Sequence, residues 1–272
     1  MSEHAMPTGP ALEGRVALVT GASRGIGAAT ARAFSAAGAK LVLAARDENA
    51  LHALADDISG RGGCAVAIPT DVQYPESVCR LVEQTVGAYG RLDVAVNCAA
   101  DNGHRPTPLA DVSIGDFDRA IAVSLRGVFL AMKYEIPAML QGGGGAIVNM
   151  SSTAAHRPVG GLAGYVTAKA ALEGMTRTAA LDYAAAGIRI NALAPGPILT
   201  EQLHRAGADA QRTVAATVPA RRLGSPEEVA AAAVWLCGPG AEFVTGTTVT
   251  VDGGLLAGMA PFAPTARHEG RR

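Results

Sequence analysis

Seven short apolar runs divide this chain of 272 residues, and longer alanine-rich stretches lie between them. Most of the runs are apolar at nearly every position, which is typical of strands buried on both faces of a parallel sheet. Their alternation with helices predicts one α/β domain, a doubly wound, mostly parallel seven-stranded sheet with helices on both faces. The predicted strands are Val16–Thr20, Leu41–Arg46, Ala65–Ile68, Leu92–Asn97, Ala146–Met150, Ile188–Leu193 and Thr248–Val251, and the predicted helices span 25–37, 48–59, 75–89, 115–140, 164–186 and 226–237.

The composition excludes several classes of protein. Only 17% of the residues are charged, 49% are hydrophobic and the net charge is −1, which excludes a disordered chain and a basic surface for nucleic acid or membranes. The 4 cysteines form no CxxC pair and no zinc-like spacing with histidine, which indicates reduced thiols and no metal site. Because no signal-peptide pattern and no apolar run of about 18 residues occurs, we expect a cytoplasmic protein without a membrane partner.

A glycine-rich turn follows the first predicted strand and leads into the first predicted helix. Gly21 permits a tight turn, Gly25 lets the backbone approach a diphosphate, and Gly27 lets helix and strand pack closely. The helix N-terminus directs its N–H groups and its positive dipole end at the phosphates. In this context the turn predicts a dinucleotide-binding site. The turn also contains Ser23, Arg24 and Ile26.

A series of motifs extends this pattern along the chain: Thr20-Gly-Ala-Ser-Arg-Gly-Ile-Gly27, Asn97-Cys98-Ala99-Ala100, Ser152, Tyr165-Val-Thr-Ala-Lys169, Pro195-Gly196 and Val251-Asp252-Gly253-Gly254. Together they resemble the short-chain dehydrogenase/reductase family, in its compact single-domain branch near the 3-oxoacyl reductases and glucose dehydrogenases. The resemblance covers roughly residues 12–256. It implies a Rossmann-type fold, a nicotinamide cofactor and hydride transfer between a ketone and a secondary alcohol.

The identity of the cofactor depends on the end of the second strand. In the family, NAD-dependent members carry an acidic residue where this chain has Ala45. A carboxylate there would bind both ribose hydroxyls and repel a 2′-phosphate, so its absence removes the repulsion. Arg46 follows, and together with Arg24 of the glycine turn it is suited to bind a 2′-phosphate. We predict NADP(H) as the cofactor, with NAD(H) as the alternative. We expect Asp47 to be the N-cap of the next helix.

The resemblance implies further cofactor contacts. The adenine is expected beside the loop after the third strand, and the nicotinamide beside the ends of the fourth and sixth strands. The usual Asn-Asn-Ala-Gly motif reads Asn-Cys-Ala-Ala here, and the methyl group of Ala100 requires a negative φ. The implied contacts are Asp71, Val72, Asn97, Ala99, Tyr165, Lys169, Pro195, Gly196, Ile198 and Thr200.

The candidate catalytic residues lie around the predicted helix at 164–186. Tyr165 and Lys169 are four residues apart, so they share one face of this helix. Tyrosine ionises near pH ~10, and a neighbouring ammonium and an oxidised nicotinamide are expected to lower its pKa. Ser152, at the end of the fifth strand, is expected to hold the substrate oxygen, whereas Ser151 points to the other side. The family's helix-kinking asparagine is Ser124 here, which either keeps a water for proton relay or is a small packing residue.

We therefore predict an NADP(H)-dependent oxidoreductase that reduces a ketone to a secondary alcohol, or the reverse, with Tyr165 as general acid or base. The alternatives are an NAD-dependent alcohol, sugar or dihydrodiol dehydrogenase, and a non-catalytic dinucleotide-sensing protein. The resemblance also implies a homotetramer or a homodimer. Residues 1–13 are expected to form a flexible leader, 14–258 the catalytic domain with a substrate lid at 199–222, and 259–272 a C-terminal tail.

Overall fold

The computed structural model describes residues 10–258 and is built around one parallel sheet. The strand order is β3-β2-β1-β4-β5-β6-β7, and each neighbouring pair is parallel. The predicted doubly wound, Rossmann-type sheet is confirmed. Its strands are β1 (Val16–Thr20), β2 (Lys40–Ala45), β3 (Cys64–Pro69), β4 (Val94–Asn97), β5 (Gly145–Met150), β6 (Ile188–Pro195) and β7 (Thr248–Val251).

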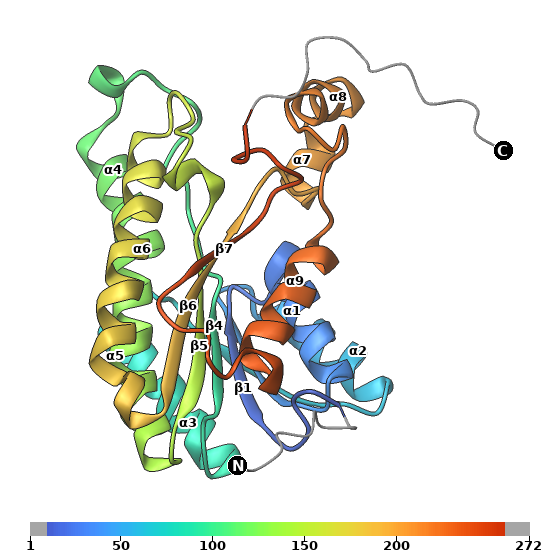
Figure 1. Cartoon of the computed structure of the whole chain (residues 1–272), viewed down its shortest axis with the longest axis vertical. Coiled ribbons are helices and arrows are strands. Elements are labelled where there is room, and N and C mark those ends of the chain that lie inside the picture. The colour runs from blue at the N-terminus through green and yellow to red at the C-terminus, as the bar shows by residue number, and fades with distance from the viewer. Residues whose placement is uncertain (1–9, 259–272) are drawn as a thin grey trace, which may run out of the picture.

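Helices cover both faces of the sheet, as Figure 1 shows. One face carries α1 (Gly25–Ala36), α2 (Glu48–Gly60) and α9 (Pro226–Cys237), and the other carries α3 (Pro75–Tyr89), α5 (Gly127–Gln141) and α6 (Ala163–Tyr183). The apolar side chains of each helix layer pack against the sheet as a separate core cluster. The strand order reverses between β1 and β4, and in open α/β sheets a crevice for ligands lies beyond the strand ends at this point.

The long helix predicted at 115–140 is divided in the structure. A π-helical turn, η2 (Ala122–Arg126), separates α4 (Ile114–Ile121) from α5. In this turn the Ser124 hydroxyl accepts from the Asp101 N–H (2.9 Å) and donates to the Asp101 carbonyl (2.8 Å). Residues 114–141 are helical throughout, so the predicted helix is present, but the apolar period does not encode the π turn inside it, which coincides with a contact to a distant loop.

The segment predicted as a lid contains two short helices, α7 (Glu201–Arg205) and α8 (Ala208–Thr217). They lie beyond the carboxyl ends of the strands, at the top of Figure 1. Near the other end of the chain, Leu12 is buried and its N–H donates to the Ala37 carbonyl (2.9 Å), so the packed domain includes part of the predicted leader. The rest of that leader, residues 1–9, and the predicted tail at 259–272 lie outside the described residues.

A chain of buried polar groups links the central strands to α5 and α6. The Thr176 hydroxyl donates to the Leu172 carbonyl and accepts from the Asn149 amide (3.0 Å). The Asn149 oxygen is then left to accept from the Asn97 amide (3.1 Å), which also donates to Glu135 (3.1 Å). Two buried oxygens at the Glu135 end of this hydrogen-bond network receive no hydrogen bond from the described residues. They are Asn97 Oδ1 and Glu135 Oε1.

A proton on Glu135 adds a donor at this end of the network, where two buried oxygens have none. Glu135 is fully buried, and burial raises its pKa to about 7, although the hydrogen bond from Asn97 lowers it. A neutral carboxylic acid both donates and accepts, whereas the carboxylate only accepts. The acid form therefore fits this site, and ionisation of Glu135 destabilises the fold.

The Glu135→Gln variant should have a weaker pH dependence of stability than the wild type. The stability that neutral Glu135 contributes is fully present below pH 4.5 and is lost as the pH rises through about 7. The contribution of Glu135 to the free energy of unfolding differs by on the order of 3 kcal/mol between pH values well below 4.5 and pH values well above 7. The wild-type free energy of unfolding, measured in urea from about pH 5 to about pH 8, should fall relative to that of Glu135→Gln. Glu83→Gln, an exposed control on α3, should follow the wild type; parallel curves for wild type and Glu135→Gln would contradict the prediction.

Candidate active site

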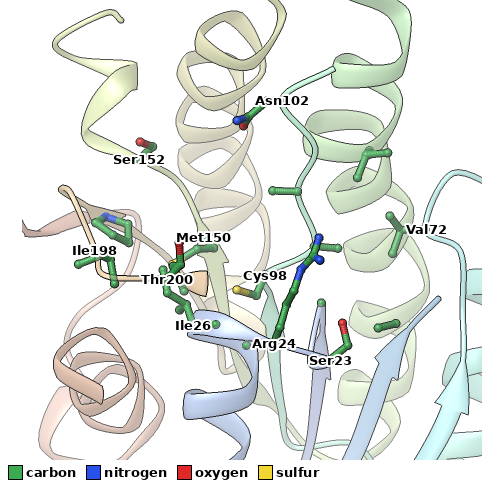
Figure 2. A pocket seen from close by; sticks show the side chains of 18 of the residues that line it. Ser23, Arg24, Ile26, Val72, Cys98, Asn102, Met150, Ser152, Ile198 and Thr200 are labelled. Atoms are coloured by element: carbon green, nitrogen blue, oxygen red, sulfur yellow. The ribbon is translucent and has the colours of Figure 1, made fainter. Parts of the chain in front are cut away.

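A cavity of about 620 Å³ opens at the carboxyl ends of the strands. Its volume is typical of sites for small molecules, and its position is where open α/β sheets bind ligands. Figure 2 shows Ser23 and Arg24 on one side of the cavity and Ile198 and Thr200 on the other, with Cys98 between them. Motifs that are far apart in the sequence therefore line a single cavity.

Most of the predicted site residues line this cavity. The exceptions are Asn97 and Ser124. The predicted residues that line it are Gly21, Ser23, Arg24, Gly25, Ile26, Gly27, Arg46, Asp71, Val72, Ala99, Ser152, Tyr165, Lys169, Pro195, Gly196, Ile198 and Thr200.

The glycine turn has the geometry to hold a dinucleotide phosphate. Gly21 has φ +66°, and a Cβ atom there would lie 2.8 Å from the Ala99 nitrogen. Gly25 also has positive φ, and a Cβ atom on Gly27 would collide with the Gly21 carbonyl. The backbone N–H groups of Gly25, Ile26 and Gly27 donate to no atom of residues 10–258. These free donors at a helix N-terminus, beside a cavity, fit the anionic part of the cofactor.

The end of β2 carries the residues that distinguish the two nicotinamide cofactors. Arg46 follows Ala45 there and lines the cavity together with Arg24. Within the part of the chain that the structure describes, neither guanidinium group is hydrogen-bonded or ion-paired to another residue. Asp47 caps α2 as predicted, since its carboxylate accepts from the Ala50 N–H (3.1 Å). Two positive charges therefore face this end of the cavity.

The loop after β3 lies at the same end of the cavity. The Asp71 carboxylate accepts from the backbone N–H of Gln73 (3.0 Å) and from its side-chain amide (3.2 Å). Asp71 thus stabilises its own loop while lining the cavity beside Val72. The contact of these two residues with an adenine ring stays a prediction.

Tyr165, Lys169 and Ser152 meet at the centre of the site. The Lys169 Nζ lies 5.6 Å from the centroid of the Tyr165 ring, and it donates to the Met150 carbonyl at the end of β5 (2.6 Å). The Ser152 Oγ accepts from the Ala154 N–H (3.1 Å), which leaves the hydroxyl proton for another acceptor. The Ser152 hydroxyl acts to lower the pKa of the Tyr165 phenol, and both side chains line the cavity. The arrangement places two O–H groups side by side in the cavity.

The protonation of these groups differs from the sequence-based expectation. Burial raises the pKa of Tyr165, and the hydrogen bond with Ser152 lowers it by less. Desolvation of the phenolate dominates in the protein alone, and the lowering expected from Lys169 together with an oxidised nicotinamide stays a prediction. Burial also lowers the pKa of Lys169 to about 8 and raises that of the neighbouring Cys98 thiol to about 11. At neutral pH, Tyr165 is therefore a neutral phenol that can donate a proton.

Asn97 and Ser124 lie outside the cavity. The Asn97 side chain points to the α5 face of the sheet and binds Glu135, so its placement gives no support to the predicted cofactor contact. Side chains alternate along a strand, and motif position alone does not say which face each one takes. Ser124 is fully buried and uses its hydroxyl to hold Asp101. It fixes the loop after β4 to η2, and a role in proton relay stays a prediction.

Motif spacing does not identify several other residues that line the cavity. Glu201 and Arg205 of α7 approach it from the lid segment and pair with each other (3.4 Å), at a spacing that favours such a pair on a helix. Ala100 also lines the cavity. Its φ is not positive, since within 10–258 the positive-φ residues other than glycine comprise Arg221 alone, so the backbone tolerates its methyl group. The remaining lining residues include Ala44, Thr70, Cys98, Asn102, Val123, Met150 and Ser151.

Residues 21–256 of the chain match the family model described as enoyl-(acyl carrier protein) reductase. An A-factor type γ-butyrolactone 1′-reductase (1S-forming) from Streptomyces virginiae is 42% identical over 248 residues, which cover 90% of this chain and 96% of the relative. The chain is a short-chain dehydrogenase/reductase. The resemblance predicted from the motifs is thereby confirmed.

Other short-chain dehydrogenases/reductases match over nearly their whole length. A 2,5-dichloro-2,5-cyclohexadiene-1,4-diol dehydrogenase from Sphingobium indicum is 40% identical over 250 residues, which cover 90% of this chain and 98% of the relative. A solved 7α-hydroxysteroid dehydrogenase, complexed with NADH and 7-oxo glycochenodeoxycholic acid, has a TM-score of 0.85 and 34% identity and covers 89% of this chain and 94% of its own. This short-chain dehydrogenase/reductase is an oxidoreductase of the alcohol/ketone type, with a nicotinamide dinucleotide cofactor. No helix within residues 10–258 combines the length and apolar character that crossing a bilayer requires.

The Ser124→Ala variant should loosen the loop that leads from β4 into the cavity. Loss of the hydroxyl leaves the Asp101 N–H and carbonyl without partners, at a cost of about 1–3 kcal/mol in the free energy of unfolding. Asn102 lies in this loop, so the KM for a ketone should rise while the Kd for the reduced cofactor stays the same. Urea denaturation, steady-state kinetics and cofactor titration measure these effects. Ser59→Ala, an exposed control on α2, should change none of them, and an unaltered Ser124→Ala enzyme would disprove the role of the hydroxyl.

Proposed function

We propose that the protein is an NADP(H)-dependent ketone reductase that forms a secondary alcohol, with Tyr165 as the general acid. The observation that carries this proposal is the meeting of Tyr165, Lys169 and Ser152 in the same cavity as the glycine turn. A dinucleotide-binding protein without turnover has no need of a half-buried phenol beside a buried ammonium. This arrangement therefore favours catalysis over sensing.

The chain's own groups divide the work of the reaction. The bound cofactor supplies the hydride. The Tyr165 phenol donates its proton to the carbonyl oxygen, and the Ser152 hydroxyl donates a hydrogen bond to the same oxygen as negative charge develops there. Lys169 is held by the Met150 carbonyl and keeps further N–H donors for the ribose hydroxyls. The raised pKa keeps the Tyr165 phenol protonated at neutral pH, which is the form that proton donation to the carbonyl oxygen requires.

The choice of NADP(H) rests on Arg24 and Arg46. Both guanidinium groups line the cavity, and Ala45 provides no carboxylate to repel a 2′-phosphate. A charge-assisted hydrogen bond from each guanidinium contributes about 1.5–3 kcal/mol. The Asp47 carboxylate is already bound to the N-terminus of α2, which leaves the two arginines as the groups suited to this anion.

The second candidate is an NAD-dependent dehydrogenase of alcohols or diols. It is favoured by the likeness to the diol dehydrogenase from Sphingobium indicum and to the hydroxysteroid dehydrogenase that was solved with NADH. The site chemistry is the same in both directions, because the group that protonates an alkoxide also removes the alcohol proton. The two candidates differ in cofactor and in physiological direction.

We further propose a homotetramer, or a homodimer, with α7 and α8 as a lid over the substrate. Large apolar side chains are exposed in two regions, Phe129 and Leu181 on α5 and α6, and Trp235 and Phe243 near α9, which supports self-association. Thr200, which precedes α7, lines the cavity, so movement of this segment would open and close the site.

The Tyr165→Phe variant should lose ketone reduction almost completely. Removal of a general acid lowers kcat by about 10²–10⁴-fold. The ring still fills its place, so the Kd for NADPH, measured by fluorescence titration, should stay within about twofold of the wild type. Tyr183→Phe, on the same helix and away from the cavity, serves as the control. Substantial residual turnover in Tyr165→Phe would remove Tyr165 from the mechanism, and a wild type that binds NADPH but turns over no ketone would favour the sensor.

The Arg46→Ala variant should shift cofactor preference towards NADH. Loss of one charge-assisted hydrogen bond lowers kcat/KM for NADPH by roughly 10–150-fold and leaves that for NADH nearly unchanged. The ratio of the two values is the measurement, and Arg24→Ala should act in the same direction. Arg61→Ala, at the far end of α2, should leave the ratio as it is. A wild type that prefers NADH, with a ratio that Arg46→Ala does not alter, would establish the second candidate.

A further inference from the structure

Glu173 is a buried carboxylate on the helix that carries Tyr165 and Lys169. The three residues are spaced four apart, so they form one stripe along α6, each one turn from the next. Only 4% of Glu173 is exposed. A buried carboxylate is costly unless it is hydrogen-bonded or paired, so its partners indicate why it is there. None of the chemistry described above uses this residue.

Both partners of Glu173 lie on the segment that carries Ser152. The Ser151 hydroxyl donates to Glu173 Oε1 (2.7 Å), and the His156 Nε2 lies 2.9 Å from Oε2. Ser151 is buried and directly precedes Ser152, whereas His156 follows the short turn η3 (Thr153–Ala155). One carboxylate therefore binds both ends of the segment 151–156.

The contacts of the α6 stripe continue this pattern turn by turn. Tyr165 lines the cavity together with Ser152, Lys169 donates to the Met150 carbonyl, and Glu173 accepts from the Ser151 hydroxyl. Three turns of α6 thus lie against residues 150–152, at and just after the end of β5. Tyr165, Lys169 and the three residues 150–152 line the cavity, whereas Glu173 lies behind them and is buried.

We propose that Glu173 is a positioning residue that holds Ser152 against Tyr165 by binding Ser151 and His156. This inference rests on the proposed reaction, since it assigns Ser152 and Tyr165 to the same substrate oxygen. A shift of about 1 Å between two such groups can lower a rate by about 10²-fold. Glu173 acts through the segment 151–156 and does not touch the cavity.

The backbone of the segment 151–156 is also held by hydrogen bonds that do not involve Glu173. The Ser151 N–H donates to the Leu193 carbonyl (2.6 Å), and the Arg157 and Ala155 N–H groups are bound within the segment. Removal of the Glu173 carboxylate therefore leaves the backbone bonds of the segment in place and frees the side chains at its two ends. Loss of position, with retention of the fold, is the expected defect.

The first test is kinetic and uses Glu173→Ala and the milder Glu173→Gln. We expect kcat for ketone reduction to fall roughly 10- to 100-fold in Glu173→Ala and less in Glu173→Gln, whose amide oxygen still accepts from Ser151. The Kd for NADPH should be unchanged in both. His156→Gln keeps an N–H donor and should retain most of the activity that His156→Ala loses. Glu83→Gln, on the exposed side of α3, is the control. Equal losses in kcat and cofactor binding, or no loss at all, would overturn the proposal.

The second test needs no turnover, so its failure is distinct from failure of the proposed function. In protein labelled at the Cζ atom of tyrosine, the Tyr165 resonance is the one missing from Tyr165→Phe. Ser152→Ala should move it by removing the hydroxyl that acts on the phenol, and Glu173→Ala should move it in the same direction. In the Ser152→Ala background, Glu173→Ala should add nothing, because both act on one contact. A resonance that Glu173→Ala leaves unchanged, or additive shifts, would overturn the proposal even in an enzyme that reduces ketones.

Discussion

The register of the parallel sheet decides where each functional group of this enzyme lies. Thr20 of β1 pairs with Asn97 of β4, and Asn97 pairs with Asn149 of β5, so these strands end at nearly the same level. The glycine turn and the segment that carries Ser152 leave the sheet at this level and come together there. Because side chains alternate along a strand, a slip of one residue would exchange groups that face the cavity for groups that face the core. The cavity is therefore a consequence of strand pairing rather than of any one loop.

Buried polar groups then determine how α6 sits on this sheet. Lys169 and Glu173 are almost fully buried, and each is bound to a residue at the end of β5. Removing either partner would leave an uncompensated polar group, at a cost of several kcal/mol. Apolar packing alone tolerates small rotations of a helix about its axis. The hydrogen bonds of Lys169 and Glu173 instead fix the rotation of α6 about its axis and its position along the strands. Tyr165 is placed in the cavity by contacts one and two turns away from it.

Departures from the usual family motifs are accommodated by local hydrogen bonds and backbone conformation. The hydroxyl of Ser124 binds both backbone groups of Asp101, so a short side chain still joins the π turn to the loop after β4. Cys98 stands where the family usually has asparagine, and burial raises the pKa of its thiol to about 11, so it adds no charge beside Lys169. The site therefore keeps a neutral phenol and a cation in a largely desolvated surrounding.

The sequence by itself determined the seven strands, the glycine turn and the Tyr165–Lys169 pair, because apolar periodicity, glycine conformation and helical spacing act over a few neighbouring residues. Only the tertiary structure decided that Asn97 points away from the cavity, that burial raises the pKa of Tyr165, and that Glu173 binds two residues of the segment carrying the catalytic serine. These properties depend on groups that are distant along the chain and become neighbours only when α5 and α6 pack against the sheet. Desolvation and hydrogen-bond partners are set by that packing, and no local pattern of residues encodes them.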